Sequence, residues 1–309
     1  MATPNGHLVL VGTTASGKSA LAMEMARVRP GVELVSMDSM QIYRGMDIGT
    51  ATPTVQEQVE VPHHLLDIVD PGEEFTVSAF QERCTAVVAD LDDRGVCGVM
   101  VGGTGLHVRA VVDDLEIPGR FDEVRADLEA EPDTTVLHAR LRGLDPVAAE
   151  RMEPTNRRRV IRALEVCIGA GRPFSSFGPG LDSYPASPFT QVGVHLPRPV
   201  VDRRIAERYE QQVSEGFVGE VRTLASLPGG LSRTARQALG YRQVLDHLEG
   251  RCSLEEAIHA AVVATRRFAR RQERWFGRDP RIEWMDAEED PMEVLNQVLS
   301  HLDGCADRR

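Results

Sequence analysis

The sequence feature that most constrains the fold is residues 12–19, Gly-Thr-Thr-Ala-Ser-Gly-Lys-Ser, which fits the pattern G-x-x-x-x-G-K-[ST]. In this motif backbone N–H groups surround a polyphosphate, while the lysine and the hydroxyl reach phosphate and Mg²⁺. The apolar run 8–11 is typical of a buried strand, and residues 20–26 are good helix formers. We therefore expect a strand, a phosphate loop and a helix whose N-terminus attracts anions. The predicted phosphate-binding residues are Gly12, Thr13, Thr14, Ala15, Ser16, Gly17, Lys18 and Ser19.

Lys18 is the only lysine in the chain, among 35 lysine and arginine residues. A tight phosphate loop requires a compact ammonium, which a planar guanidinium does not replace. The composition therefore supports the phosphate-loop prediction. The motif names a class of ligand and leaves the reaction open, although most chains that carry it hydrolyse or transfer the γ-phosphoryl group of a nucleotide.

Asp38 follows a second predicted strand, residues 32–36. In an open parallel sheet the carboxyl ends of the strands face the ligand crevice, so we expect Asp38 to lie near the phosphate loop. Three interpretations of Asp38 stay open. The carboxylate binds Mg²⁺ through water, it accepts a proton or hydrogen bond from a substrate, or it only caps a turn.

Four further apolar runs predict more strands of the same sheet, at residues 65–69, 98–101, 191–196 and 282–284. The strand at 98–101 ends in a second glycine-rich turn, Gly102-Gly103-Thr104-Gly105. Glycine turns of this kind are common, but here the turn should lie at the same sheet edge as the phosphate loop. We expect it to form a second wall of one pocket.

Residues 44–62 have no clear period and predict a long surface loop. His63 and His64 follow it. A metal site at this pair is disfavoured, because adjacent residues of a strand point to opposite faces. The five cysteines are scattered without a C-x-x-C pair, which argues against a zinc site or a disulfide framework.

The stretch from about residue 119 to 188 has a helical pattern without strands. Helices are predicted at 122–131, 135–141, 145–152 and from the Asn156 cap to about 170. On the last of these, Arg158, Arg159 and Arg162 lie opposite the apolar face without balancing carboxylates, which favours a polyanion partner over a solvated face. A helical stretch between α/β segments predicts a domain of residues 119–189 inserted into a core of residues 1–118 and 190–309.

A second arginine-rich helix is predicted near the C-terminus. Ser253 and Glu256 form a capping box for a helix that continues to about Phe276. Arginines spread over the arc opposite its apolar face; they are Arg266, Arg267, Arg270, Arg271 and Arg274. The formal net charge of −12 disfavours a nucleic-acid partner, but local charge decides where a polyanion docks.

The remaining features of the sequence bear on location. No apolar run approaches the ~18 residues that cross a bilayer, and no signal peptide is evident. Together with the scattered cysteines, this predicts a cytoplasmic protein that does not bind membranes.

Four motifs in order resemble those of the tRNA dimethylallyltransferase family, the bacterial tRNA isopentenyltransferases. They are the phosphate loop, D-S-x-Q-I-Y at 38–43, G-G-T-G-L at 102–106, and T-R-x-x-A-R-R-Q-x-x-W-F at 265–276. Thr13 stands where proline is typical and His107 where tyrosine is typical, and neither change removes a phosphate-binding group. The fold implied is α/β, a P-loop NTPase-like core with a mostly parallel sheet flanked by helices and a small all-helical insertion.

The resemblance implies a reaction and a set of residues that carry it. A dimethylallyl group passes from dimethylallyl diphosphate to N6 of the adenosine immediately 3′ of the anticodon in tRNA, and diphosphate leaves. Lys18, Ser19, Arg222 and Mg²⁺ held partly by Ser19 stabilise the diphosphate, and Asp38 accepts the proton of N6. The residues implied to bind tRNA are Asp38, Ser39, Met40, Gln41, Thr104, Arg125, Arg158, Arg159, Val160, Ile161 and Arg162.

Three other classes of function stay open. A small-molecule or nucleotide kinase shares the loop and the fold but consumes ATP. An isopentenyltransferase acting on free adenine nucleotides shares the chemistry but needs no tRNA anticodon stem-loop. A non-catalytic RNA-binding switch has no use for Asp38 in the pocket. We expect a monomer that binds tRNA and dimethylallyl diphosphate.

Overall fold

A six-stranded sheet forms the centre of the larger part of the computed structural model, which describes residues 6–306. Its strands are β1 (Leu8–Gly12), β2 (Val32–Ser36), β3 (His63–His64), β4 (Cys97–Gly102), β5 (Thr190–His195) and β6 (Ile282–Asp286). The order is β3-β2-β4-β1-β5-β6, and each neighbouring pair is parallel. Because β4 lies between β1 and β2, the segments that follow these three strands meet at one edge of the sheet.

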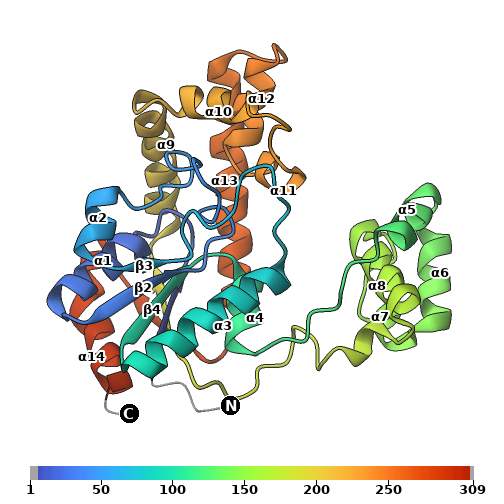
Figure 1. The fold of residues 1–309 in the computed structure, drawn as a ribbon, viewed down its shortest axis with the longest axis horizontal. Helices are drawn as coiled ribbons and strands as arrows, with labels where there is room; N and C mark the ends of the chain where they lie inside the picture. The colour runs from blue at the N-terminus through green and yellow to red at the C-terminus, as the bar shows by residue number, and fades with distance from the viewer. Residues whose placement is uncertain (1–5, 307–309) are drawn as a thin grey trace. The chain divides into compact units, whose positions relative to one another are not determined.

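Helices cover both faces of this sheet (Figure 1). They are α1 (Lys18–Val28), α2 (Val55–Glu60), α3 (Val77–Arg94), α4 (Gly105–Val112), α9 (Arg198–Ser214), α10 (Phe217–Ala225), α11 (Arg233–Arg236), α12 (Tyr241–Leu248), α13 (Leu254–Phe276) and α14 (Leu295–Ala306), with the 3₁₀ turn η2 (Pro291–Val294) before the last. Parallel strands covered on both faces are apolar along their whole length, and each residue of β1 is buried. The predicted α/β architecture with a parallel sheet is confirmed.

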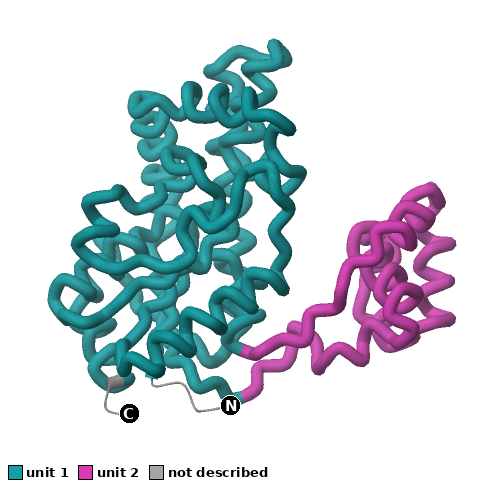
Figure 2. The backbone as a smooth tube through the Cα atoms, in the orientation of Figure 1, with its two compact units in different colours: residues 1–112, 186–309 teal, residues 113–185 magenta. Residues whose placement is uncertain are grey.

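The chain divides into two compact units, residues 1–112 with 186–309 and residues 113–185 (Figure 2). The sequence predicts a slightly shorter insertion, residues 119–189. The smaller unit contains α5 (Asp122–Ala130), α6 (Thr134–Leu144), α7 (Pro146–Glu150), α8 (Arg157–Ala170) and the 3₁₀ turn η1 (Phe174–Ser176). It has a hydrophobic core of its own, to which Leu128, Leu141 and Leu164 belong. An independent core allows such a unit to fold as a separate body.

Two details of the predicted secondary structure are wrong. The strand predicted at 65–69 does not form, and the strand in this region is the two-residue β3 just before it. Leu65 and Asp67 have positive φ angles of 64° and 52°, which turn the backbone out of an extended path. The loop predicted at 44–62 contains α2, whose N-cap Thr54 forms a complete capping box with Glu57. The pattern T-x-x-E in the sequence is the signal for that helix start.

The long helices begin where the sequence predicts. The side chain of Asn156 accepts a hydrogen bond from the Arg159 N–H at the start of α8, and Ser253 and Glu256 form the capping box of α13. Among residues 6–306, no helix is both long and apolar enough to cross a membrane.

Candidate active site

The phosphate loop connects the end of β1 to Lys18, the first residue of α1. Two of its residues are left-handed, Ala15 with φ 62° and Gly17 with φ 79°. Left-handed residues alternating with ordinary ones turn successive N–H groups toward one concave side, which is how backbone binds anions. Glycine is required at position 17 also because a Cβ atom there would lie 2.4 Å from Cγ of Pro291. The local backbone is therefore shaped as the motif predicts.

The surroundings of Lys18 in this loop disfavour its positive charge. Its Nζ donates a hydrogen bond of 3.2 Å to the carbonyl oxygen of Thr13. Burial lowers the pKa of Lys18 to about 8; the negative charge of Asp38 opposes this shift and the positive charge of Arg208 adds to it. An ammonium whose charge is disfavoured by its surroundings gains stability when an anion arrives.

Asp38 follows β2 and lines the same cavity as Lys18. Its Oδ1 accepts a 2.8 Å hydrogen bond from the N–H of Met40, so the carboxylate caps its own turn. Within the described residues, Oδ2 of Asp38 has no hydrogen-bond donor. The turn-cap interpretation is therefore correct for one oxygen, and the second oxygen is available to a ligand.

The residues after Asp38 connect this turn to its neighbours. The N–H of Ser39 donates to Oγ1 of Thr104 at 3.4 Å, and Oγ1 of Thr104 donates to Oγ of Ser39 at 3.3 Å. Gln41 Nε2 donates to the carbonyl oxygens of Thr50 and Ala51, at 3.3 and 3.1 Å. The D-S-x-Q segment is thus bonded to the second glycine-rich turn on one side and to a loop that lines the cavity on the other.

One cavity of about 380 Å³ unites these elements. Its lining residues come from the phosphate loop, the Asp38 turn, the loop at 50–51, the end of β4, α9 and α13. They are Thr14, Ala15, Gly17, Lys18, Ser19, Asp38, Gln41, Thr50, Ala51, Val101, Gly102, Gly103, Arg204, Glu207, Arg208, Gln211, Phe268 and Gln272. Residues from all four sequence motifs therefore line a single cavity.

Arg204 and Arg208 are cavity cations that the sequence prediction missed. The Nε atom of Arg208 is buried and has no hydrogen-bond partner among the described residues, an arrangement that suits an anionic ligand. Arg222, the arginine implied by the family resemblance, lies exposed on α10 and does not line the cavity. Arg204 and Arg208 stand four residues apart on α9, so they share a helix face. That spacing was visible in the sequence, but which face meets the cavity depends on the fold.

The smaller unit corrects part of the predicted RNA-binding set. Val160 and Ile161 are 0% and 3% exposed and pack in the core of this unit, so their side chains have no surface to offer a ligand. The buried carboxylate of Glu165 accepts from both Arg125 and Arg162, at 3.3 and 2.6 Å. The predicted absence of balancing carboxylates is therefore wrong for Arg162.

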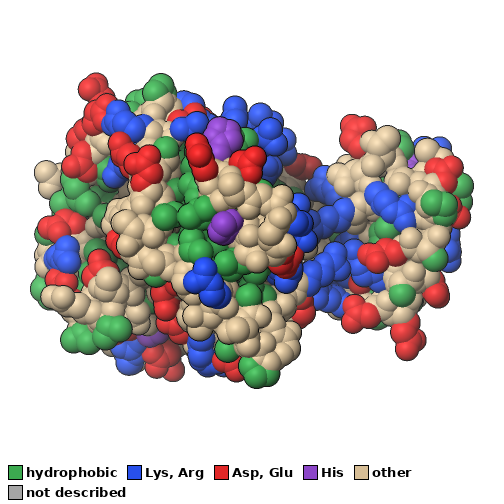
Figure 3. All heavy atoms as spheres, turned by 90° about the horizontal axis from the view of Figure 1, so that it is seen from above, with side chains coloured by type: hydrophobic (Ala, Val, Ile, Leu, Met, Phe, Trp, Pro, Cys, Tyr) green, Lys and Arg blue, Asp and Glu red, His purple; other side chains and the backbone are tan. Residues whose placement is uncertain are grey.

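Arginines remain at the surface in both units. We call surface arginines the exposed arginines of α8 and α13 that have no carboxylate partner among the described residues. They are Arg158 and Arg159 on α8, and Arg267, Arg270, Arg271 and Arg274 on α13. Arg271 lies over the ring of Phe268, 5.6 Å from its centroid, at the edge of the cavity. In the space-filling view Lys and Arg side chains gather in patches on the surface (Figure 3).

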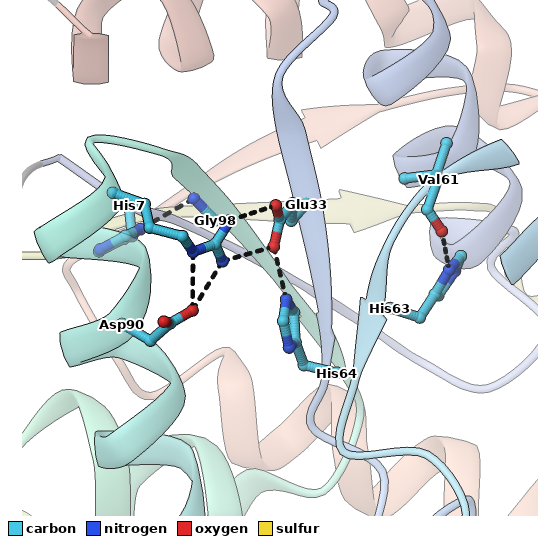
Figure 4. Close-up of polar contacts among 8 residues, drawn as sticks. His7, Glu33, Val61, His63, His64, Asp90 and Gly98 are labelled. Carbon is cyan, nitrogen blue, oxygen red and sulfur yellow. Dashed lines mark hydrogen bonds and ion pairs between the residues drawn. The ribbon is translucent and has the colours of Figure 1, made fainter. Parts of the chain in front are cut away.

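The described residues contain no cluster of three or more His, Cys, Asp or Glu side chains that could hold a metal ion. His64 Nε2 lies 2.7 Å from Oε2 of Glu33, whereas His63 Nδ1 lies 2.7 Å from the carbonyl oxygen of Val61 (Figure 4). Arg94 and His64 together hold the pKa of Glu33 at about 2. The two histidines point to different partners, as the sequence argument expects of adjacent strand residues.

Comparison with known proteins decides the family. The family model for IPP transferase matches residues 41–279, well over half of the chain. The chain belongs to the IPP transferase family. Among the relatives of this IPP transferase, the tRNA dimethylallyltransferase of Kineococcus radiotolerans is 46% identical over 314 residues, with 98% of each chain covered. The tRNA dimethylallyltransferase of Streptomyces coelicolor is 47% identical over 285 residues, covering 90% of this chain and 89% of the relative.

Solved structures agree with this membership. The tRNA isopentenylpyrophosphate transferase of Bacillus halodurans is 36% identical to this IPP transferase, with a TM-score of 0.70 and 98% of each chain covered. A eukaryotic dimethylallyltransferase, 24% identical over 92% of this chain and 74% of its own, shares the fold with a TM-score of 0.77. The core therefore has the predicted P-loop NTPase-like fold.

Proposed function

We propose that this IPP transferase moves the dimethylallyl group of dimethylallyl diphosphate to N6 of the adenosine immediately 3′ of the anticodon in tRNA. Its similar relatives carry the name tRNA dimethylallyltransferase. The observation that carries the proposal is that Lys18, Arg208 and Asp38 line one cavity. Two cations suit a leaving diphosphate, and a carboxylate beside them suits a group that must lose a proton.

The diphosphate end of the reaction would use the phosphate loop, Lys18 and Arg208. Breaking the allylic C–O bond sends its electron pair to the diphosphate, whose negative charge grows as the bond lengthens. The loop N–H groups, the Lys18 ammonium and the Arg208 guanidinium would stabilise that charge. We assign this role to Arg208 and not to Arg222, because Arg208 lines the cavity and Arg222 does not.

Mg²⁺ is part of the proposal, with Ser19 as the residue that would hold it. Ser19 lines the cavity and offers a hydroxyl oxygen. Mg²⁺ commonly takes one or two protein oxygens and completes its shell with phosphate oxygens and water, so the donor set fits. When bound, the ion would supply further positive charge to the diphosphate.

The acceptor end would use the free oxygen of Asp38. The N6 amine of adenine is a poor nucleophile because its lone pair is delocalised into the ring. Asp38 Oδ2 would take a hydrogen bond from N6 and then its proton as the new C–N bond forms. An adenine stacked in an RNA loop cannot reach such an oxygen, so the base would be flipped into the cavity.

The RNA backbone would be held outside the cavity. The surface arginines on α8 and on α13 exceed what a mononucleotide could engage, which supports an RNA acceptor over free AMP. Phosphate contacts of this kind position an RNA without reading its sequence. Ser39, Met40, Gln41 and Thr104 would lie at the mouth beside the flipped base. We propose the monomer as the acting form.

The test is a transfer assay with radiolabelled dimethylallyl diphosphate and bulk unmodified tRNA. We expect label in tRNA and none in AMP, and no consumption of ATP in a parallel reaction. A stem-loop in which guanosine replaces the adenosine 3′ of the anticodon should receive no label, because guanine has no exocyclic amine at the same position. Equal kcat/KM for AMP and the stem-loop at matched ionic strength would replace this proposal with the free-nucleotide reaction.

A further inference from the structure

Gln272 on α13 joins the two glycine-rich turns of the cavity. Its Oε1 accepts a 2.8 Å hydrogen bond from the N–H of Thr14 in the phosphate loop. Its Nε2 donates a 2.7 Å hydrogen bond to the carbonyl oxygen of Gly103 after β4. Only 5% of the residue is exposed. The two partners fix the orientation of the amide, because one is a donor and the other an acceptor.

The second glycine-rich turn is shaped to let α13 approach. A Cβ atom at Gly103 would lie 2.3 Å from Nε2 of Gln272, and one at Gly105 would lie 2.1 Å from Nε1 of Trp275. These separations are too short for any side chain. Glycine is needed in this turn because the backbone meets α13 so closely, which is a reason distinct from phosphate binding.

We propose that Gln272 is a positioning residue for the phosphate loop. The bond to Thr14 holds the loop just before the left-handed Ala15, where its N–H groups turn toward the concave side. The bond to Gly103 ties the same amide to the wall beside Asp38. Donors that are fixed before the reaction stabilise a developing anion more than donors that must first reorganise. This inference rests on the proposed function and deepens it.

Glutamine is the side chain that these two bonds require. Glutamate has the same length and can accept from Thr14, but its carboxylate has no proton for Gly103. Methionine has a similar volume and can make neither bond, and it leaves one buried N–H and one buried carbonyl group unpaired. Gln272→Glu therefore removes one of the two hydrogen bonds and Gln272→Met removes both, whereas each variant keeps a side chain of similar size.

The first experiment compares Gln272→Met with Gln191→Met in the transfer assay. Gln191 is a matched control, since it is buried in β5 and its side-chain atoms have no hydrogen-bond partner among the described residues. We expect Gln272→Met to lower kcat about 10²-fold and to raise KM for dimethylallyl diphosphate about tenfold, with KM for the stem-loop unchanged. Gln191→Met should keep both parameters within about twofold of wild type.

The second experiment uses the pH dependence of Gln272→Glu. A carboxyl group facing a carbonyl oxygen is favoured in its protonated form, which restores the missing donor. The ratio of kcat for this variant to kcat for wild type should therefore rise as the pH falls from 8.5 to 6. Taking the ratio removes the titration of groups that both enzymes share. A melting curve for each variant confirms that the comparison is made on folded protein.

The outcomes distinguish the inference from the function on which it rests. If wild type transfers label to the stem-loop and Gln272→Met matches Gln191→Met, the positioning role is wrong and the function stands. A pH-independent ratio for Gln272→Glu would also overturn the positioning role. If wild type transfers no label under any condition, the proposed function fails before the variants are compared.

Discussion

Two groups of cations in this protein differ in how the fold holds them. Lys18 and Arg208 line the cavity, where burial lowers the pKa of Lys18 to about 8. Nε of Arg208 is buried there without a hydrogen-bond partner in residues 6–306. The surface arginines lie on the solvent faces of α8 and α13. Charges in a low-dielectric cavity act strongly on a nearby anion, whereas exposed charges are weakened by water and salt.

The difference separates two tasks that a phosphate-binding protein must perform. Few, desolvated cations suit the phosphate that changes charge during a reaction. Many, exposed cations suit phosphates that stay unchanged and only locate the substrate. The variants below test this division, beginning with the largest expected effect.

Lys18→Ala should lower turnover about 10³-fold and abolish measurable binding of dimethylallyl diphosphate, because it removes a charged donor from the loop. Lys18→Arg should recover little of this loss, since a planar guanidinium does not fit where the ammonium donates to Thr13. Steady-state kinetics on both variants gives the answer. Turnover like wild type in the arginine variant would show that any cation suffices at this position.

Arg208→Met should lower kcat about 10²-fold, whereas Arg222→Met should change it less than about twofold. The first arginine lines the cavity and the second lies exposed on α10. The pair is matched, because both substitutions replace an arginine on a helix by the same residue. Equal losses in the two variants would contradict the division between cavity and surface.

Asp38→Asn should fold and bind the anticodon stem-loop, yet turn over at least ~10²-fold more slowly, the usual loss for a positioned base. The amide can still accept from the N–H of Met40, so the turn itself is preserved. Single-turnover rates with saturating stem-loop isolate the chemical step. A full rate in this variant would leave Asp38 with the turn cap as its only role.

The affinity for dimethylallyl diphosphate should fall as the pH rises above about 8, by up to tenfold per pH unit. The sign follows from the lowered pKa of Lys18, since the ammonium binds the diphosphate and the neutral amine does not. Titration calorimetry between pH 7 and 9.5 measures this, and proton uptake should accompany binding near pH 8. An affinity that stays constant between pH 7 and 9.5 would contradict this linkage.

Replacing Arg158 and Arg159 by Gln should weaken stem-loop binding only about fivefold at low salt. The slope of log affinity against log salt should become shallower by about 1.4, as expected for two phosphate contacts on a single strand. Arg162→Gln should instead lower the melting temperature, because Arg162 is bonded to the buried Glu165. Filter binding at several salt concentrations and thermal melts distinguish the two effects.

Short sequence patterns predict much of the fold. The phosphate loop, the α13 capping box and the Asn156 cap are determined by residues within a few positions of one another, so the sequence predicts them. The cavity position of Arg208 and the bonds of Gln272 depend instead on which helix face meets the sheet. That choice is fixed by packing between segments as far apart as Thr14 and Gln272. No short sequence pattern predicts which face of the helix meets the sheet.

Lys18 carries the only side-chain amine in the chain. Its pKa of about 8 makes that amine far more nucleophilic near neutral pH than an ordinary lysine. An amine-selective acylating or aldehyde reagent would thus modify a single side chain, and that side chain belongs to the phosphate loop. Protection from the reagent reports occupancy of the loop directly, by mass spectrometry of one peptide, without a label on the substrate or a change to the protein.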